Sequence, residues 1–226
     1  MISHKHQVIF IHIPKTAGSS IEKKLGLYEE VTWGVQDHRT VKQIRPLSLF
    51  NHSRYLFNPT ALRTQSLSRY TMLNEMLGLP TDPRRHGPRA TEREFASYFK
   101  FTVVRNPWSR VYSWYRNVMR GSRHGVPACD FPTFLGKFAD NWGLRPQTYW
   151  IADFDGSIPL DRIVRFENLA EEMVDVLTEL GFKDCNLPYL LKSKNTSDYR
   201  TAYDDLSAEL VAKRYSDEIE MFNYDF

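Results

Sequence analysis

Short apolar runs followed by amphipathic stretches shape the clearest parts of this chain. Residues 8–13 (VIFIHI) are β-branched and aromatic and end at Pro14, which predicts a buried strand. A helix is expected directly afterwards, with Ser19 or Ser20 as its cap, running to about Leu25. The chain therefore opens with a strand, a tight turn and a helix.

The same order of strand, turn and helix returns twice. Residues 101–104 form the second expected strand, and Pro107 suits the first position of a helix running to about Met119. Residues 162–166 form a third strand, followed by a helix that ends at Gly181. Repeated units of this kind favour an α/β fold of three layers, in which helices flank a central parallel sheet.

Between residues 46 and 92 the hydrophobic positions follow no regular spacing, and only residues 60–77 look helical. Prolines punctuate this stretch at Pro46, Pro59, Pro80, Pro83 and Pro88. We interpret the stretch as an insertion on the acceptor side of a single domain spanning residues 1–226, since the length of the chain suits one domain.

Composition narrows the class of protein. A net charge of +3 is too mild for general nucleic-acid binding, although it suits an anionic ligand. Cys129 and Cys185 are too few for a disulfide framework or a zinc site, which indicates a reducing compartment. No apolar stretch reaches the roughly 18 residues of a membrane span, so we expect a cytoplasmic protein. Oligomeric state is not indicated.

The first turn carries the groups of an anion site. Backbone N–H groups converge where a strand runs into a glycine-containing turn and a helix, and Lys15 adds a full charge. Gly18 lets the backbone close around a ligand, and the hydroxyls of Thr16, Ser19 and Ser20 add donors. The turn differs from the nucleotide-triphosphate P-loop because its lysine precedes the glycine. The sequence also allows an alternative, an ordinary strand–turn–helix in which the lysine is incidental.

The residues IPKTAGSS resemble the 5′-phosphosulfate loop of sulfotransferases that use 3′-phosphoadenosine-5′-phosphosulfate (PAPS), and they are most similar to the carbohydrate sulfotransferase branch. This resemblance implies a P-loop-like fold in which Lys15 approaches the oxygen that bridges phosphate and sulfate. It also implies that the donors of the loop come from Thr16, Ala17, Gly18, Ser19 and Ser20.

A second segment, FTVVRNPWSRVYSWYR, resembles the 3′-phosphate motif of that family, with Arg105 and Ser113 at the matching positions. An arginine at a strand end can fork onto a phosphate. Alternatively, Arg105 pairs with a carboxylate and Ser113 is an ordinary helix residue. The tail of the chain resembles the family's closing segment, which implies lid contacts from Lys194, Asn195 and Ser197.

Sulfonyl transfer needs a base for the acceptor hydroxyl, and neutral histidine suits that role at pH 7. His38 resembles the histidine of the bacterial K-H-x-T pattern, with Asp37 in place of the lysine, and is the expected base. Asp37 either steadies the imidazolium or caps a helix expected over residues 38–44, and Thr40 either contacts substrate or caps. His12 reads as a satisfied core histidine. The others lie near the terminus or in irregular stretches: His4, His6, His52, His86 and His124.

The expected function is transfer of a sulfonyl group from PAPS to an acceptor hydroxyl on a carbohydrate, with release of adenosine 3′,5′-bisphosphate (PAP) and without a metal. Basic and aromatic side chains could attract or stack on the acceptor: Arg84, Arg85, Arg89, Trp33, Trp142 and Trp150. Two rivals remain, an ATP-dependent small-molecule kinase with an atypical P-loop and a non-catalytic nucleotide-binding module.

Overall fold

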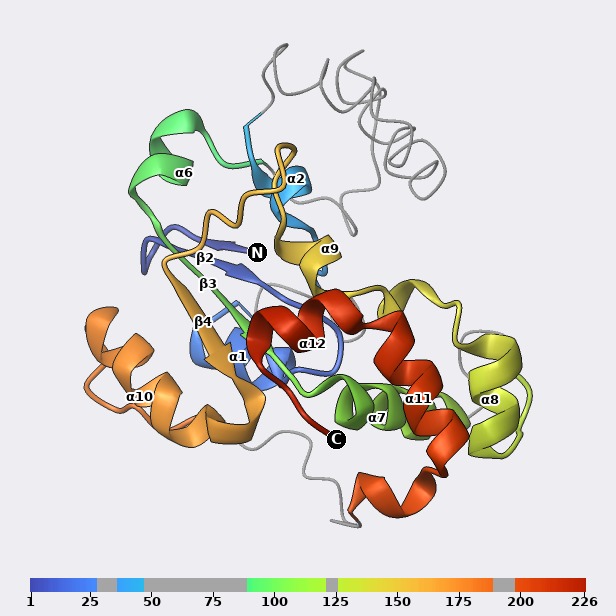
Figure 1. Cartoon of the computed structure of the whole chain (residues 1–226). Coiled ribbons are helices and arrows are strands. Elements are labelled where there is room, and N and C mark those ends of the chain that lie inside the picture. Colours follow the sequence, from blue (N-terminus) through green and yellow to red (C-terminus); the bar gives the residue numbers. More distant parts are fainter. Residues whose placement is uncertain (28–35, 47–88, 121–125, 189–197) are drawn as a thin grey trace.

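The computed structural model describes residues 1–27, 36–46, 89–120, 126–188 and 198–226 (Figure 1). Within these residues, four strands form one sheet in the order β1-β2-β3-β4. The strands are β1 (Ile2–Ser3), β2 (Val8–Ile11), β3 (Phe99–Val104) and β4 (Arg162–Arg165). The three longer strands are parallel to one another, and β1 adds a short antiparallel edge. The sheet is therefore mixed, which differs from the wholly parallel sheet expected.

The register aligns the ends of the parallel strands. Ile11 at the end of β2 pairs with Thr102, and Val104 at the end of β3 pairs with Arg165 at the end of β4. All three strands thus leave the sheet at the same edge, which in open α/β sheets is the usual place for ligands. The two candidate motifs follow β2 and β3 at this edge.

Helices cover both faces of the sheet. One face holds α1 (Gly18–Lys24) and α10 (Leu169–Glu179), and the other holds α2 (Val41–Ile44), α6 (Glu92–Ser97), α9 (Gln147–Ile151) and α12 (Ser216–Phe222). Beyond the strand ends lie α7 (Pro107–Met119), α8 (Phe131–Phe138) and α11 (Asp205–Arg214) (Figure 1). Short 3-10 turns are η2 (Trp142–Leu144), η3 (Phe166–Asn168) and η4 (Tyr199–Ala202).

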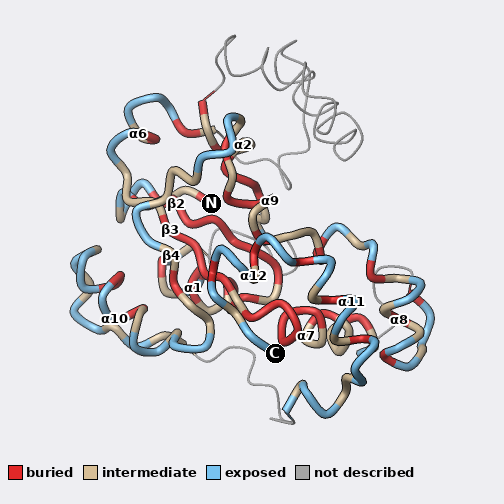
Figure 2. The backbone as a smooth tube through the Cα atoms, viewed as in Figure 1, coloured by how far each residue is buried: buried red, intermediate tan, exposed pale blue. Residues whose placement is uncertain are grey.

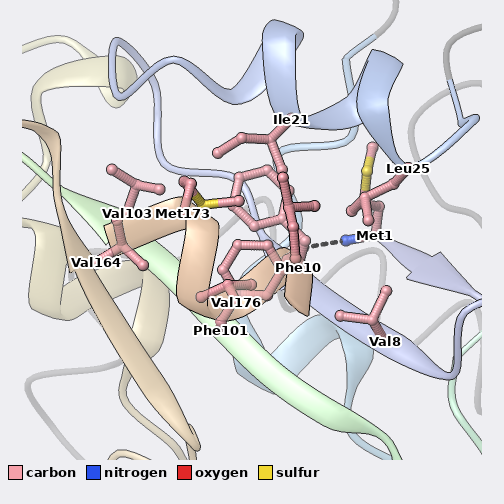
Figure 3. Close-up of a cluster of buried hydrophobic side chains, with 11 residues drawn as sticks. Met1, Val8, Phe10, Ile21, Leu25, Phe101, Val103, Val164, Met173 and Val176 are labelled. Atoms are coloured by element: carbon pink, nitrogen blue, oxygen red, sulfur yellow. Dashed lines mark hydrogen bonds between the residues drawn. The ribbon is translucent and has the colours of Figure 1, made fainter. Parts of the chain in front are cut away.

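The core on the α1 and α10 face follows the two-residue alternation of the strands. Val8 and Phe10 of β2 pack with Phe101 of β3 against Ile21 of α1 and Met173 of α10 (Figure 3). The Met1 amine donates to the Phe10 carbonyl at 2.6 Å and so holds the first residue beside β2. This core anchors α1, and with it the loop before α1.

The opposite face and the helical region have cores of their own. Ile9 and Ile11 pack against Val41 and Ile44 of α2 and Trp150 of α9. A third cluster joins α7, α8 and α11 through side chains such as Trp108, Val111, Trp114, Phe134 and Tyr215. Figure 2 shows that β2, the second half of β3 and the start of α7 are continuously buried backbone, so the two corners at the sheet edge follow buried elements.

Several expected element bounds are confirmed. The helix α7 runs from Pro107 to Met119, with Pro107 in the first turn. The third expected strand is β4, which begins at Arg162 as expected and ends one residue early, at Arg165. Gly181 follows α10 with a positive φ of 77°. These positions carry strong local signals, because proline suits a helix start and glycine suits its end.

Other expectations are wrong. The strand β2 ends at Ile11 rather than at residue 13, and neither Ser19 nor Ser20 caps the first helix. Its N-cap is Ala17, whose φ of 66° is left-handed and which makes no side-chain capping bond. The helix α2 is shorter than expected, because the Thr40 side chain caps it and excludes residues 38–40.

The expected insertion lies mostly at residues 47–88, outside the described part of the chain. No helix in the described ranges is both long enough and apolar enough to cross a membrane.

Candidate functional site

The two candidate motifs meet in space. Arg105 directly follows β3, and its Nη1 donates to the Lys15 carbonyl in the loop after β2, at 3.1 Å. The loop residues are half-buried or buried, and Arg105 is half-buried. Two segments 90 residues apart in the chain therefore form one site at the edge of the sheet.

The loop between β2 and α1 has a strained backbone. Lys15 and Ala17 have φ angles of 71° and 66°, in the left-handed region that non-glycine residues rarely adopt. Each such residue costs about 1–3 kcal/mol, and residues of this kind gather at ligand sites. The Thr16 hydroxyl donates to the Ile13 carbonyl at 2.8 Å, so this side chain fixes the shape of the loop.

Gly18 is required by a neighbouring side chain. A Cβ at this position would lie 1.9 Å from Nε2 of His12, a separation that no real contact has. The imidazole of His12 thus fills the space that a side chain at position 18 would need. The small residue in the motif is explained by packing inside the protein, in addition to any role toward a ligand.

His12 is a satisfied core histidine, as expected, but its partner is a buried carboxylate. The side chain is 2% exposed, and its Nδ1 lies 2.5 Å from Oε1 of Glu22 in α1. Its ring also lies against the ring of His38, with centroids 4.1 Å apart. His12 therefore connects the loop, α1 and the expected base.

His38 is held in one tautomer by the backbone. Its Nδ1 lies 2.8 Å from the His12 carbonyl, which can only accept, so Nδ1 carries the proton and Nε2 keeps a lone pair. Burial and the neighbouring His12 lower the pKa of His38 to about 3, so the ring is neutral at pH 7. A neutral imidazole with a free Nε2 is the form that a general base requires.

Gln36 links His38, the expected base, to the loop. Its side-chain amide contacts Oγ of Ser19 at one end and lies 3.2 Å from Nε2 of His38 at the other. The Gln36 NH2 donates to Ser19 and its Oε1 faces Nε2 of His38, so two acceptors meet in the tautomer assigned above. A flipped amide, with its NH2 toward Nε2, would donate to the lone pair there. An acceptor hydroxyl must replace this contact to reach Nε2.

Asp37 does not cap a helix. Its carboxylate takes a forked pair of bonds from Arg39, at 2.9 and 2.7 Å, and lies 3.5 Å from the Met1 amine. Although burial opposes ionisation, these cations hold the pKa of Asp37 well below its usual range. The cap of α2 is instead Thr40, which forms a capping box with Gln43.

The corner that follows β3 is held by several bonds and is positively charged. Nε of Arg105 donates to Oγ of Ser109 at 3.0 Å, and the guanidinium stacks on Phe166 at 4.0 Å. Gln147 holds the backbone of Arg105 with bonds of 2.8 and 2.9 Å. Burial lowers the pKa of Arg105 to about 10, which leaves it charged at pH 7.

Ser113 lies one helical turn beyond Ser109 on the same side of α7, which continues the polar face that begins at Arg105. The other expected contacts, Lys194, Asn195 and Ser197, lie outside the described residues. So do Trp33, Arg84 and Arg85.

A buried arginine supports the loop from behind. Arg110 is fully buried, and its Nε donates to the Pro14 carbonyl at 3.3 Å. Its Nη2 donates to the carbonyls of Gly143 and Arg145, both at 2.8 Å. Sequence reasoning missed this residue, together with Gln36, Ser109 and Gln147. For Arg110 and Ser109, their place in the first turn of α7, close behind Arg105, was a usable signal.

An exposed aromatic side chain stands beside the expected base. Trp142 is 42% exposed, and its ring centroid lies 5.5 Å from that of His38. Trp150 is buried behind it, with centroids 5.7 Å apart. The open side of His38 thus has an apolar wall.

Comparison with known families decides the class of protein. The sequence model of the sulfotransferase family, of the family 2-like type, matches residues 1–225. The chain belongs to the sulfotransferase family. No curated protein and no solved structure matches it. Membership gives this sulfotransferase sulfonyl transfer as its general chemistry and a hydroxyl-bearing acceptor as its partner.

Proposed function

We propose that this sulfotransferase moves a sulfonyl group from PAPS to a carbohydrate hydroxyl, with Lys15 and Arg105 on the donor and His38 as base. The observation that carries the proposal is the bond from Arg105 Nη1 to the Lys15 carbonyl. It supports one donor site, because it brings the expected 3′-phosphate and 5′-phosphosulfate residues to the same edge of the sheet.

The chemistry of the two corners fits a donor with anionic groups at both ends. Arg105 is a charged, planar donor suited to the 3′-phosphate, with Ser113 further along α7. The P-loop-like turn presents Lys15 and the backbone of residues 16–20 to the phosphosulfate. The ammonium of Lys15 stabilises the charge that develops on the leaving phosphate oxygen.

The reaction is a single displacement. The acceptor oxygen forms a bond to sulfur while the bond from sulfur to the bridging phosphate oxygen breaks, and PAP leaves with that electron pair. The hydroxyl proton passes to Nε2 of His38, whose Nδ1 already donates to the His12 carbonyl. No step of this scheme requires a metal.

The aromatic wall beside His38 supports a carbohydrate as the acceptor. The exposed face of Trp142 can stack on the apolar face of a sugar ring while a hydroxyl points at Nε2. Arg89 has another role close by, because its Nη1 donates to the carbonyls of Lys42 and Arg45 at 2.8 and 2.9 Å and closes the end of α2.

Turnover of sulfur-labelled PAPS over a panel of saccharides and phenols tests the function. We expect label on saccharides and a loss of about a hundredfold or more in kcat for His38→Ala. The matched control is His4→Ala, whose side chain is 58% exposed. Full activity of His38→Ala on the acceptor that the screen identifies would show that the base is another group.

The rivals predict different donors. A kinase would require Mg²⁺ and would bind adenosine 5′-phosphate as well as PAP, whereas this proposal expects activity in a chelator and strong preference for the 3′-phosphate. A binding module would hold PAP without turnover on any acceptor. Calorimetry with PAP and adenosine 5′-phosphate, beside the turnover assay, separates all three.

A further inference from the structure

A buried carboxylate lies next to the base and has no part in the scheme above. Glu22, in the second turn of α1, is 3% exposed, and its Oε1 lies 2.5 Å from Nδ1 of His12. A carboxylate in such a place is costly unless it is paired. Its hydrogen-bond partner is an imidazole, not a lysine or arginine, so this bond alone does not cancel its charge.

The pair holds one proton between the two side chains. Burial raises the pKa of Glu22 to about 7 and lowers that of His12 to about 3. The resting form above pH 7 is therefore a Glu22 carboxylate that accepts a hydrogen bond from Nδ1–H of a neutral His12. This form leaves a net negative charge inside the protein, close to the sheet edge.

His38 is the group that can neutralise this charge. Its ring lies 4.1 Å from the ring of His12, and its Nδ1–H is bonded to the His12 carbonyl at 2.8 Å. When the acceptor proton reaches Nε2, His38 becomes a cation. The ring of His12 lies against this cation and is also bonded to Glu22. The attraction is strong in a buried site and arises only as the proton is transferred, which is what accelerates a reaction.

The other charged groups around His38 do not serve this role equally. Asp37 is the second nearby carboxylate, but Arg39 already compensates it with a forked pair of hydrogen bonds. The Met1 amine faces both carboxylates, but burial lowers its pKa to about 6, so it is mostly uncharged above pH 7. Lys15 acts on the same surroundings in the opposite sense, because its charge disfavours protonation of His12. Of these two carboxylates, Glu22 is thus the one whose uncompensated charge attracts a protonated His38.

We propose that Glu22, acting through His12, is a positioning residue that fixes the orientation of His38 and supplies the counter-charge for its protonated form. The proposal deepens the base role of His38 and rests on it. It also explains why His12 fills the space beside Gly18, since the same ring then holds the donor loop and the base in one arrangement.

The test is Glu22→Gln, measured as kcat and KM between about pH 6 and pH 9. The amide oxygen of glutamine keeps the hydrogen bond from His12 and removes the charge. Above pH 8 we expect kcat to fall by about tenfold with KM for PAPS unchanged. As pH drops through about 7, protonation of Glu22 should lower wild-type kcat to the level of the variant.

The matched control is Glu179→Gln, an exposed carboxylate at the end of α10, which should leave the pH profile unchanged. A Glu22→Gln profile that keeps the wild-type height and acidic limb would overturn the proposal. A fall in the affinity for PAP as large as the fall in kcat would also overturn the proposal, since it would indicate only a structural role for Glu22 in the donor loop.

A second measurement does not depend on turnover. Nitrogen-15 spectra of the ligand-free protein should show the rings of His12 and His38 responding to a titration near pH 7 in the wild type and not in Glu22→Gln. If this response is absent from the wild type, the proposal fails whatever the reaction is. If it is present but His38→Ala keeps full activity, the base assignment fails and the catalytic counter-charge fails with it.

Discussion

The two strand-to-helix corners at the sheet edge are built in opposite ways. The corner after β2 runs through residues 12–17, has two left-handed non-glycine residues, and leads into a seven-residue helix without a side-chain cap. The corner after β3 consists of Arg105 and Asn106 alone and leads into a thirteen-residue helix. There the Asn106 side chain caps the helix and Pro107 begins it.

The contrast shows how a strained loop is kept in place. The irregular corner does not stabilise itself, because its carbonyls at Pro14 and Lys15 are bound by Arg110 and Arg105 from the regular corner. Regular elements thus hold the irregular loop of the site in its shape, which is how precise sites are usually supported. The predictions below test this division between a reactive loop and a supporting helix.

The largest effect is expected from Lys15→Met, which removes the charge of the irregular corner. We expect a loss of about a thousandfold in kcat with little change in melting temperature, because the ammonium acts on charge that develops during transfer. Labelled PAPS turnover and thermal denaturation measure the two quantities. Lys23→Met, at an exposed position in α1, is the control, and a similar loss there would contradict a specific role for Lys15.

Arg105 tests the junction between the corners. We expect Arg105→Ala to weaken PAP binding by about a hundredfold and Arg105→Lys by about tenfold. Lysine keeps the charge but lacks the fork that binds the Lys15 carbonyl and, in the proposed function, the 3′-phosphate. Calorimetry with PAP gives the affinities, and Arg120→Ala at the exposed end of α7 is the control. Unchanged affinity in Arg105→Ala would place the 3′-phosphate elsewhere.

The regular corner was predictable from the sequence, and the irregular one was predictable only in part. Asn106, Pro107 and the apolar spacing behind them are local signals, so the bounds of α7 follow from them. The cap at Ala17 is left-handed and has no side-chain capping bond. Arg105 and Arg110 bind the carbonyls of Lys15 and Pro14 just before it, and no local pattern reveals these tertiary contacts.

The candidate site residues divide in the same way, into those with a local sequence signal and those placed only by tertiary contacts. The motifs predict Lys15 and Arg105 as site residues because each follows a buried strand. Gln36 and Gln147 act through tertiary contacts to Ser19 and to the Arg105 backbone, and their neighbours in sequence carry no sign of it. The strand β1 has only two residues, too few for any alternation to show.

Gly18→Ala probes the packing of the irregular corner. The added methyl group would collide with the His12 ring, so we expect a loss of about 1–3 kcal/mol in the free energy of unfolding. Gly136→Ala is the matched control, because it lies in α8 with nothing near its Cβ position and should gain about 0.5–1 kcal/mol. Denaturant titration compares the two. Equal stability of both variants would show that the His12 ring can move aside.

The smallest effect is expected at the regular corner, from Asn106→Ala. The cap bond to the Ser109 N–H is lost, as is the bond from Nδ2 to the Asp225 carbonyl, so we expect a loss of about 1 kcal/mol in the free energy of unfolding. Asn106→Asp keeps the cap acceptor and should retain much of this stability. Because Gln147 also holds the Arg105 backbone, PAP affinity should change far less than in Arg105→Ala. If calorimetry found equal losses of affinity, the corner after β3 would depend on its cap, and the loop after β2 would have no rigid support.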